Sequence, residues 1–161
     1  MDEKEILENL LEKCYRYLSY RPRSEREMTN YMLKKSARNK NIDEKIIAAA
    51  IERLKEQDLV NDDSFVAWWV DSRSAFRPKG PFALRGELLA KGISKDTIDR
   101  YFEDNKMDEA DLAKKVLLKK ERQLSSLERE EKFKKSMSLL LRRGFSYHVS
   151  KKAFEDFIKK E

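Results

Sequence analysis

The sequence contains few of the residues that break helices or form turns. It has 4 glycines and 3 prolines among 161 residues, where average usage of the two together would be roughly 12%. Folds rich in strands need turn residues roughly every eight to twelve positions, so a β-sandwich or β-barrel is excluded. Charged residues make up 41% of the chain and aromatic residues 10%, which supplies both solvated faces and material for cores. The composition predicts an all-α protein built from amphipathic helices.

Cysteine and histidine are also scarce. With Cys14 and His148 as the only residues of their kinds, the chain has no internal disulfide and lacks the four ligands of a structural zinc site. Cys14 lies on a helical stripe of apolar residues, which indicates a buried structural thiol rather than a nucleophile with His148 as its base. Gly80 and Gly86 are not followed by the Gly-Lys-Ser/Thr of a phosphate-binding loop. We therefore expect no metal, no cofactor and no enzymatic activity.

Long apolar runs are absent as well. The apolar runs that occur, such as residues 139–141, are far too short to span a membrane. The acidic start of the chain, residues 1–5, is unlike a secretory signal. No heptad pattern continues over several turns, which argues against a coiled-coil dimer. The expectation is a soluble, cytoplasmic monomer without a membrane partner.

The positive charge is concentrated toward the end of the chain. The formal net charge is +6, and residues 109–161 hold 15 basic and 9 acidic residues, whereas 1–58 and 59–108 are nearly balanced. Such a basic end favours polyanions or an acidic protein surface as partners. Because acidic residues are interleaved, solvated helices of mixed charge explain the same pattern.

Three copies of one three-helix design follow one another, over residues 1–58, 59–108 and 109–161. The junction between the second and third helix repeats at Ile42, Ile93 and Phe145, which lie 51 and 52 positions apart. The turn between the first and second helix reads Arg-Pro-Arg at 21–23 and Arg-Pro-Lys at 77–79, and the third copy has no proline there. Stacking of such units predicts an elongated, curved molecule with a long concave face.

Capping residues mark the expected helix ends. Ser24 with Glu27 and Ser125 with Glu128 have the spacing of capping boxes. Further N-caps are expected at Asp43, at Asp62 or Asp63, at Ser94 and at Ser146, and helix stops at Gly92 and Gly144. The two adjacent acids at 62 and 63 are interpreted as caps rather than as a metal site.

Four stretches in a fixed order carry a family resemblance. They are YLSYRPRSERE at 17–27, NDDSF at 61–65, KG followed by LRGELLAKGI within 79–93, and LRRGFSY at 141–147. Over nearly its whole length the chain resembles RecX, the bacterial regulator of the RecA recombinase. Val66 stands where the family usually has alanine, and Ser150 fills a usually apolar position. The resemblance implies three tandem three-helix repeats without catalysis. It also implies binding in the groove of the RecA filament on single-stranded DNA, with inhibition of ATP hydrolysis, strand exchange and the co-protease activity that triggers the SOS response.

Cations at the repeated turns and helix ends are the candidate contacts with such a partner. They are Arg21, Arg23, Arg77, Lys79, Arg85, Arg142 and Arg143. The turn residues also flank a helix stop and start, and cations in a last helical turn complement the helix dipole, so a purely structural role stays open for each. Trp69 shares a helix face with Phe65 and is expected in the core. Its neighbour Trp68 is expected to be exposed and is the candidate interface anchor.

Two functions follow from these residues. The first is regulation of RecA by binding to its filament and possible contact with single-stranded DNA. The alternative is a general nucleic-acid-binding helical repeat that uses the basic last third. Binding to bare DNA works by counterion release and weakens steeply with salt, whereas docking to a protein filament should depend on salt less.

Overall fold

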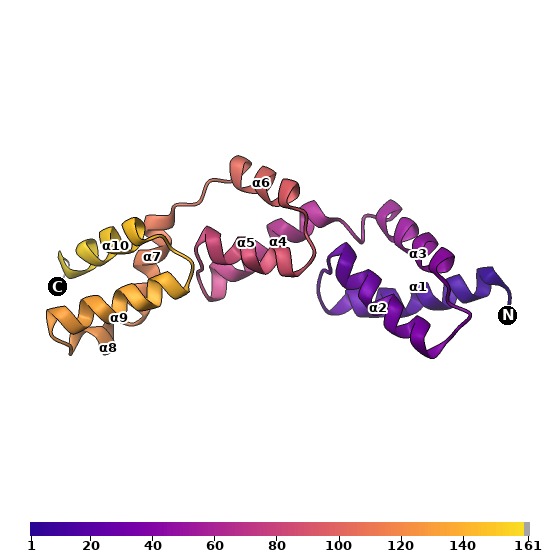
Figure 1. Cartoon of the computed structure of the whole chain (residues 1–161), viewed down its shortest axis with the longest axis horizontal. Coiled ribbons are helices and arrows are strands. Elements are labelled where there is room, and N and C mark those ends of the chain that lie inside the picture. The colour runs from indigo at the N-terminus through magenta and orange to yellow at the C-terminus, as the bar shows by residue number, and fades with distance from the viewer. Residues whose placement is uncertain (160–161) are drawn as a thin grey trace. The chain divides into compact units, whose positions relative to one another are not determined.

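The computed structural model describes residues 1–159, which form helices and no strand (Figure 1). The ten helices of this part of the chain are α1 (Glu3–Tyr20), α2 (Glu25–Arg38), α3 (Glu44–Glu56), α4 (Asp62–Phe76), α5 (Pro81–Ala90), α6 (Lys95–Asp104), α7 (Glu109–Lys119), α8 (Glu121–Ser125), α9 (Arg129–Arg142) and α10 (Tyr147–Lys159). The prediction of an all-α protein is confirmed. None of the described helices is long and apolar enough to cross a membrane.

Most of the predicted helix ends are confirmed. Ser24 and Glu27 form the capping box of α2, since each side chain accepts the backbone N–H of the other residue. Asp43 accepts the N–H of Ile46 at the start of α3. Ser94 and Ser146 accept the N–H three residues later at the starts of α6 and α10. These ends were predictable because a cap is decided by residues within one helical turn.

The N-cap of α4 differs from the prediction. The side chain of Asn61, rather than that of Asp62 or Asp63, accepts the N–H of Ser64, at 3.1 Å. Asp62 instead accepts the backbone N–H of Glu25 at 2.9 Å, in the first turn of α2. Asn and Asp cap helices about equally well, so the three adjacent candidates cannot be separated by residue type.

The capping box predicted at Ser125 and Glu128 is wrong. Ser125 is the last residue of the short helix α8, and α9 begins at Arg129. Glu128 is the N-cap of α9 and makes no side-chain capping hydrogen bond. The sequence pattern did not predict α8, whose five residues are too few to show a helical period.

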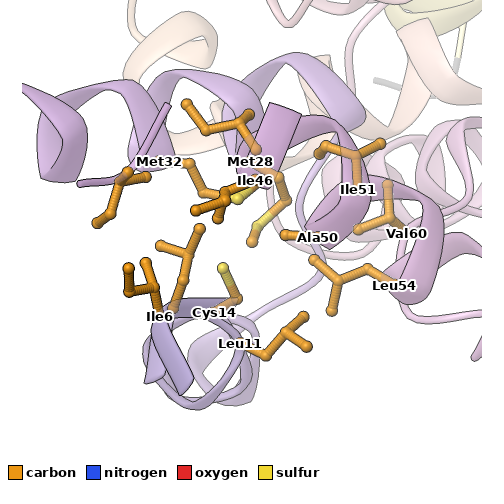
Figure 2. Packing of buried hydrophobic residues seen from close by; sticks show 13 residues of the cluster. Ile6, Leu11, Cys14, Met28, Met32, Ile46, Ala50, Ile51, Leu54 and Val60 are labelled. Atoms are coloured by element: carbon orange, nitrogen blue, oxygen red, sulfur yellow. The ribbon is translucent and has the colours of Figure 1, made fainter. Parts of the chain in front are cut away.

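The described residues divide into two compact units, each with its own core. Unit 1 consists of Met1–Trp68 and Leu89–Thr97, and unit 2 of Trp69–Leu88 and the residues from Ile98 onward. In unit 1, α1, α2 and α3 pack against one another around buried apolar side chains that point toward each other in Figure 2. Cys14 belongs to this core and is fully buried, as predicted.

The core of unit 2 is built mainly by α7, α9 and α10. α10 packs against both α7 and α9. Its buried side chains include Val116 and Leu117 from α7, Leu140 from α9, and Phe154 and Phe157 from α10. Ser150 of α10 is buried as well, and its hydroxyl has no hydrogen-bond partner among the described residues.

Three leucines next to buried residues of their helices lie outside these cores. Leu33, Leu89 and Leu141 are about half exposed. Each directly follows or precedes a buried residue on its helix, and neighbouring residues are about 100° apart around a helix axis. One of two adjacent leucines therefore faces solvent, and the period alone does not say which.

Candidate partner-binding surfaces

The first Arg-Pro turn, at the start of α2 in unit 1, is organised by Glu27. The Arg21 guanidinium donates to both carboxylate oxygens of Glu27, at 2.5 and 3.3 Å, and Lys91 lies 3.5 Å from the same carboxylate. Burial raises the pKa of Glu27, but the bonds from Arg21 and from the Ser24 N–H, with the charge of Lys91, outweigh it, so the pKa lies below its ordinary value. Arg21 is thus largely neutralised within the molecule.

The same turn also contacts the Lys91-Gly92 junction of unit 1. The buried Ser24 hydroxyl donates to the carbonyl oxygen of Lys91 at 2.7 Å. Gly92 has φ +82°, and a Cβ there would lie 2.5 Å from the Arg26 side chain. The Arg-Pro motif and the Lys-Gly motif are therefore two sides of one packing contact, which gives both a structural role.

A pocket of about 590 Å³ lies beside this turn. Its apolar wall includes Leu18, Leu59, Phe65 and Trp68, and Arg21 lies with its Cζ 5.8 Å from the Trp68 ring centroid. Trp68 is half-buried, so the expectation of an exposed tryptophan is wrong; it packs against Phe65, with ring centroids 5.8 Å apart. An aromatic wall of this kind fits an apolar side chain of a partner.

Arg23 lines the same pocket but faces Tyr17. Its Cζ lies 3.8 Å from the Tyr17 ring centroid, a close cation–π contact. Its Nε is buried and has no hydrogen-bond partner among the described residues. The Arg23 side chain is therefore held by stacking on a ring rather than by a carboxylate.

The second Arg-Pro turn lies in unit 2 and is organised by Glu87. Lys79 and Arg73 both form ion pairs with this carboxylate, and the Trp69 indole N–H donates to it at 2.7 Å. Burial raises the pKa of Glu87, but these donors and charges outweigh it, so the pKa is lowered. Trp69, expected in the core, is half-buried because its N–H needs this partner. Lys79 is neutralised in the same way as Arg21.

Behind this turn, the backbone of unit 2 packs very closely. Gly80 donates its N–H to the carbonyl oxygen of Arg143 at 2.7 Å, and the Arg143 guanidinium donates to the Pro78 carbonyl at 3.3 Å. Gly144 has φ +89°, and a Cβ on it would lie 2.4 Å from the Cβ of Ala83. The turn at 77–80 and the junction at 143–144 thus repeat the type of contact found in unit 1.

Three of the predicted cations come together at this place. The Arg143 guanidinium donates to the carbonyl of Pro78, the residue after Arg77, and Arg142 directly precedes Arg143, so the three residues lie at one place. Burial, and then the positive charges of Arg77 and Arg142, hold the pKa of the Arg143 guanidinium below its ordinary value. Arg77 and Arg142 are exposed. None of the three forms an ion pair with a carboxylate of the described residues. We call Arg77, Arg142 and Arg143 the arginine cluster.

Arg85, the remaining candidate, is paired within unit 2. Its guanidinium donates to Asp99 at 2.5 Å and stacks over Phe102, with Cζ 5.0 Å from the ring centroid. Of the seven predicted cations, only those of the arginine cluster combine proximity to one another with the lack of a carboxylate partner in the part of the chain that the structure describes.

The two organising glutamates were missed as site residues. Glu27 was predicted as part of a capping box only. The sequence does indicate a role for Glu87 as an ion-pair partner, because it is the sole acidic residue between Asp71 and Asp96, a segment that carries six cations. Among the described residues no group of three or more His, Cys, Asp or Glu side chains is arranged to hold a metal ion.

Comparison with known proteins identifies the family. Residues 11–54 match the first three-helix domain of RecX, and residues 61–101 match the second three-helix domain of RecX, which together is more than half of the chain. The chain belongs to the RecX family. Six of the eight candidate residues lie within the two matched RecX domains, whereas Arg142 and Arg143 lie outside them.

Curated relatives and solved structures agree with this assignment. Regulatory protein RecX of Bacillus pumilus is 35% identical over 144 residues, and that of Streptococcus pneumoniae 32% over 142 residues; each match covers 87% of this chain and 52% of the relative. The chain spans about half the length of these relatives. The crystal structure of RecX from Lactobacillus salivarius matches with a TM-score of 0.77 at 22% identity, over 97% of this chain and 99% of that one. A second crystal structure, of a regulatory protein RecX, matches with a TM-score of 0.69 at 26% identity, over 100% of this chain and 79% of that one.

Proposed function

We propose that this chain is a regulator of RecA that binds the RecA filament on single-stranded DNA and inhibits its ATPase, strand-exchange and co-protease activities. The observation that carries the proposal is the match of both three-helix domains to RecX, together with relatives named regulatory protein RecX.

The state of the candidate cations suggests which of them supply binding energy. Arg21, Lys79 and Arg85 already have carboxylate partners, so a filament would have to replace an existing ion pair. No carboxylate of the described residues pairs with the arginine cluster, and its like charges are held near one another where Arg143 donates to the Pro78 carbonyl. An anion placed there relieves the repulsion between these charges in addition to forming new contacts. We therefore assign the larger share of the electrostatic contact to the arginine cluster, and an apolar contact to the Trp68 pocket.

The direct test is the ATPase of RecA assembled on single-stranded DNA. We expect the purified chain to slow hydrolysis at less than one molecule per RecA. The double variant Arg77→Gln/Arg142→Gln should weaken inhibition, whereas Lys151→Gln/Lys152→Gln, which removes two exposed cations of α10, should inhibit like the parent. Unchanged hydrolysis at several-fold molar excess of correctly folded protein would refute the proposal.

A general nucleic-acid-binding function is the second candidate, because the arginine cluster would suit phosphates as well as carboxylates. The two functions differ in their dependence on salt. Binding to bare DNA should weaken steeply as salt rises, by counterion release, whereas docking to a preformed filament should weaken less. Titrations of the chain against DNA alone and against the RecA filament, at two salt concentrations, separate them.

A further inference from the structure

Two aromatic rings of unit 2 are almost fully exposed to solvent. Phe76, the last residue of α4, is 84% exposed, and Phe82, in the first turn of α5, is 83% exposed. Burying a phenylalanine side chain stabilises a protein by about 1.5–3 kcal/mol, so leaving two of them in water forfeits that gain twice. Both lie on the segment that contains the second Arg-Pro turn. Two exposed aromatic rings on one short segment indicate a surface that is covered by a partner.

Cations lie next to the segment that carries these rings. Arg77 follows Phe76 directly, and the Arg143 guanidinium donates to the carbonyl of Pro78, the residue after Arg77, with Arg142 next to Arg143 in the chain. Lys119 of α7 donates to the Phe76 carbonyl oxygen at 3.4 Å, which brings a fourth positive charge to the same place. Positive charges next to bare aromatic faces are the combination by which proteins hold single-stranded nucleic acids, with phosphates on the cations and bases stacked on the rings.

The hollow beside Phe82 is less suited to phosphates. A hollow of about 420 Å³ has Phe82 and Leu141 in its apolar wall and Arg85 and Glu109 among its polar residues. The charge of Arg85 is already matched by Asp99, so Glu109 leaves this hollow without excess positive charge. A phosphate is therefore favoured at the arginine cluster, and an uncharged, flat group is favoured in the hollow. A nucleotide has this division between an anionic and a flat, neutral part.

We propose that Phe76, Phe82 and the arginine cluster form a binding site for single-stranded nucleic acid that does not depend on base sequence. A duplex fits this site less well, because its bases are stacked on one another and do not offer their faces to a side chain. An acidic protein segment would satisfy the cations but gives no reason for two exposed rings. The inference makes the nucleic-acid alternative specific to one surface, and it requires no RecA.

The experiment measures binding of two fluorescent oligomers of about 20 nucleotides by anisotropy, with no RecA present. One is oligothymidylate, and the other is an abasic strand with the same phosphates and no bases. We expect Phe76→Ala/Phe82→Ala to lower the affinity for oligothymidylate by about 5-fold or more for each ring and to leave the affinity for the abasic strand unchanged. Both rings are exposed, so the circular dichroism of the variant should match that of the parent.

The cations are tested with the same two oligomers. Arg77→Gln/Arg142→Gln should weaken binding of both strands. It should also reduce the slope of log affinity against log salt concentration by about 0.7 for each cation removed. Lys151→Gln/Lys152→Gln is the control for diffuse basic charge, and Tyr20→Ala removes an exposed aromatic ring in unit 1. Neither control should change the binding of either strand.

Three results would overturn the inference. One is the absence of binding to oligothymidylate at low salt. A second is an equal loss of affinity for both oligomers in Phe76→Ala/Phe82→Ala, since the rings would then not contact bases. The third is a loss of affinity in Lys151→Gln/Lys152→Gln as large as that in Arg77→Gln/Arg142→Gln, since binding would then depend only on the overall charge. If the phenylalanine variant binds oligothymidylate like the parent but no longer inhibits RecA, the surface contacts protein; the inference is then wrong while the proposed function stands.

Discussion

Replacing Gly80 by alanine should destabilise unit 2 strongly, because its backbone touches the backbone of the Gly144 junction. A Cβ on Gly80 would lie 2.2 Å from the carbonyl oxygen of Gly144 and 2.8 Å from the nitrogen of Phe145. These atoms belong to the main chain and cannot rotate away like the end of a side chain. The two segments must therefore move apart, which also disturbs the 2.7 Å hydrogen bond from Gly80 to Arg143.

The size of the effect follows from two contributions. Forcing an extra carbon into a well-packed place costs about 1–3 kcal/mol. Weakening a hydrogen bond between two segments costs about 0.5–1.5 kcal/mol more. We expect Gly80→Ala to lower the free energy of unfolding by about 2–4 kcal/mol, a large part of the 5–15 kcal/mol typical of a domain.

Gly86 provides a matched control in the helix that follows Gly80. It lies inside α5, is exposed, and has no atom within 4 Å of the place where a Cβ would be. Gly86→Ala should therefore stabilise the protein by about 0.5–1 kcal/mol, through helix propensity alone. Urea unfolding followed by circular dichroism measures both variants. A Gly80→Ala protein as stable as the parent would refute the close packing of the two segments, whatever Gly86→Ala does.

Three further predictions concern groups that are partly or fully buried. Because the pKa of Glu87 is lowered in the folded protein, its ionised form stabilises the fold above about pH 4.5. This contribution is lost as the pH falls through the lower folded pKa. Glu87→Gln should therefore flatten the decline in stability that urea unfolding measures over that acidic range. Burial, only partly offset by a nearby cation, raises the pKa of Cys14 to about 11. At pH 8 the thiol of the native protein should therefore react with Ellman's reagent far more slowly than the thiol of the urea-unfolded protein. Equal rates would contradict the burial of Cys14. Ser150→Ala removes a buried hydroxyl that has no partner among the described residues, so it should raise the free energy of unfolding by less than about 1 kcal/mol. Ser24→Ala removes two hydrogen bonds and should lower the free energy of unfolding by about 1–2 kcal/mol. A larger loss for Ser150→Ala than for Ser24→Ala in urea unfolding would contradict this reasoning.

Much of the helical framework was predictable because its signals are local. The apolar spacing in residues 3–20 predicts α1 with its observed bounds, and the Ser24–Glu27 spacing predicts its capping box. Gly92 and Gly144, predicted as helix stops, both have positive φ. A helix period or a cap involves residues within one or two turns, so residue type and spacing suffice. The order of the RecX motifs likewise identified the family without any structural information.

The candidate site was predictable only as a set of residues. Sequence placed cations at the repeated turns and helix ends, but it treated Lys79, Arg85 and Arg142 alike. The structure pairs Lys79 with Glu87 and Arg85 with Asp99, and it gives Arg142 no carboxylate among the described residues. A long cationic side chain reaches any carboxylate that the fold brings near, so neither its type nor its spacing reveals whether it is free.

The exposure of aromatic rings was also decided by tertiary structure. Trp68 was expected to be exposed and is half-buried, because Phe65 and Arg21 pack against it. Phe76 and Phe82 are nearly bare, although phenylalanine is among the residues most often buried. A ring is buried only if another element covers it. The sequence by itself determined the helices, their caps and the family; which cations remain free and which rings face water depended on how those helices pack.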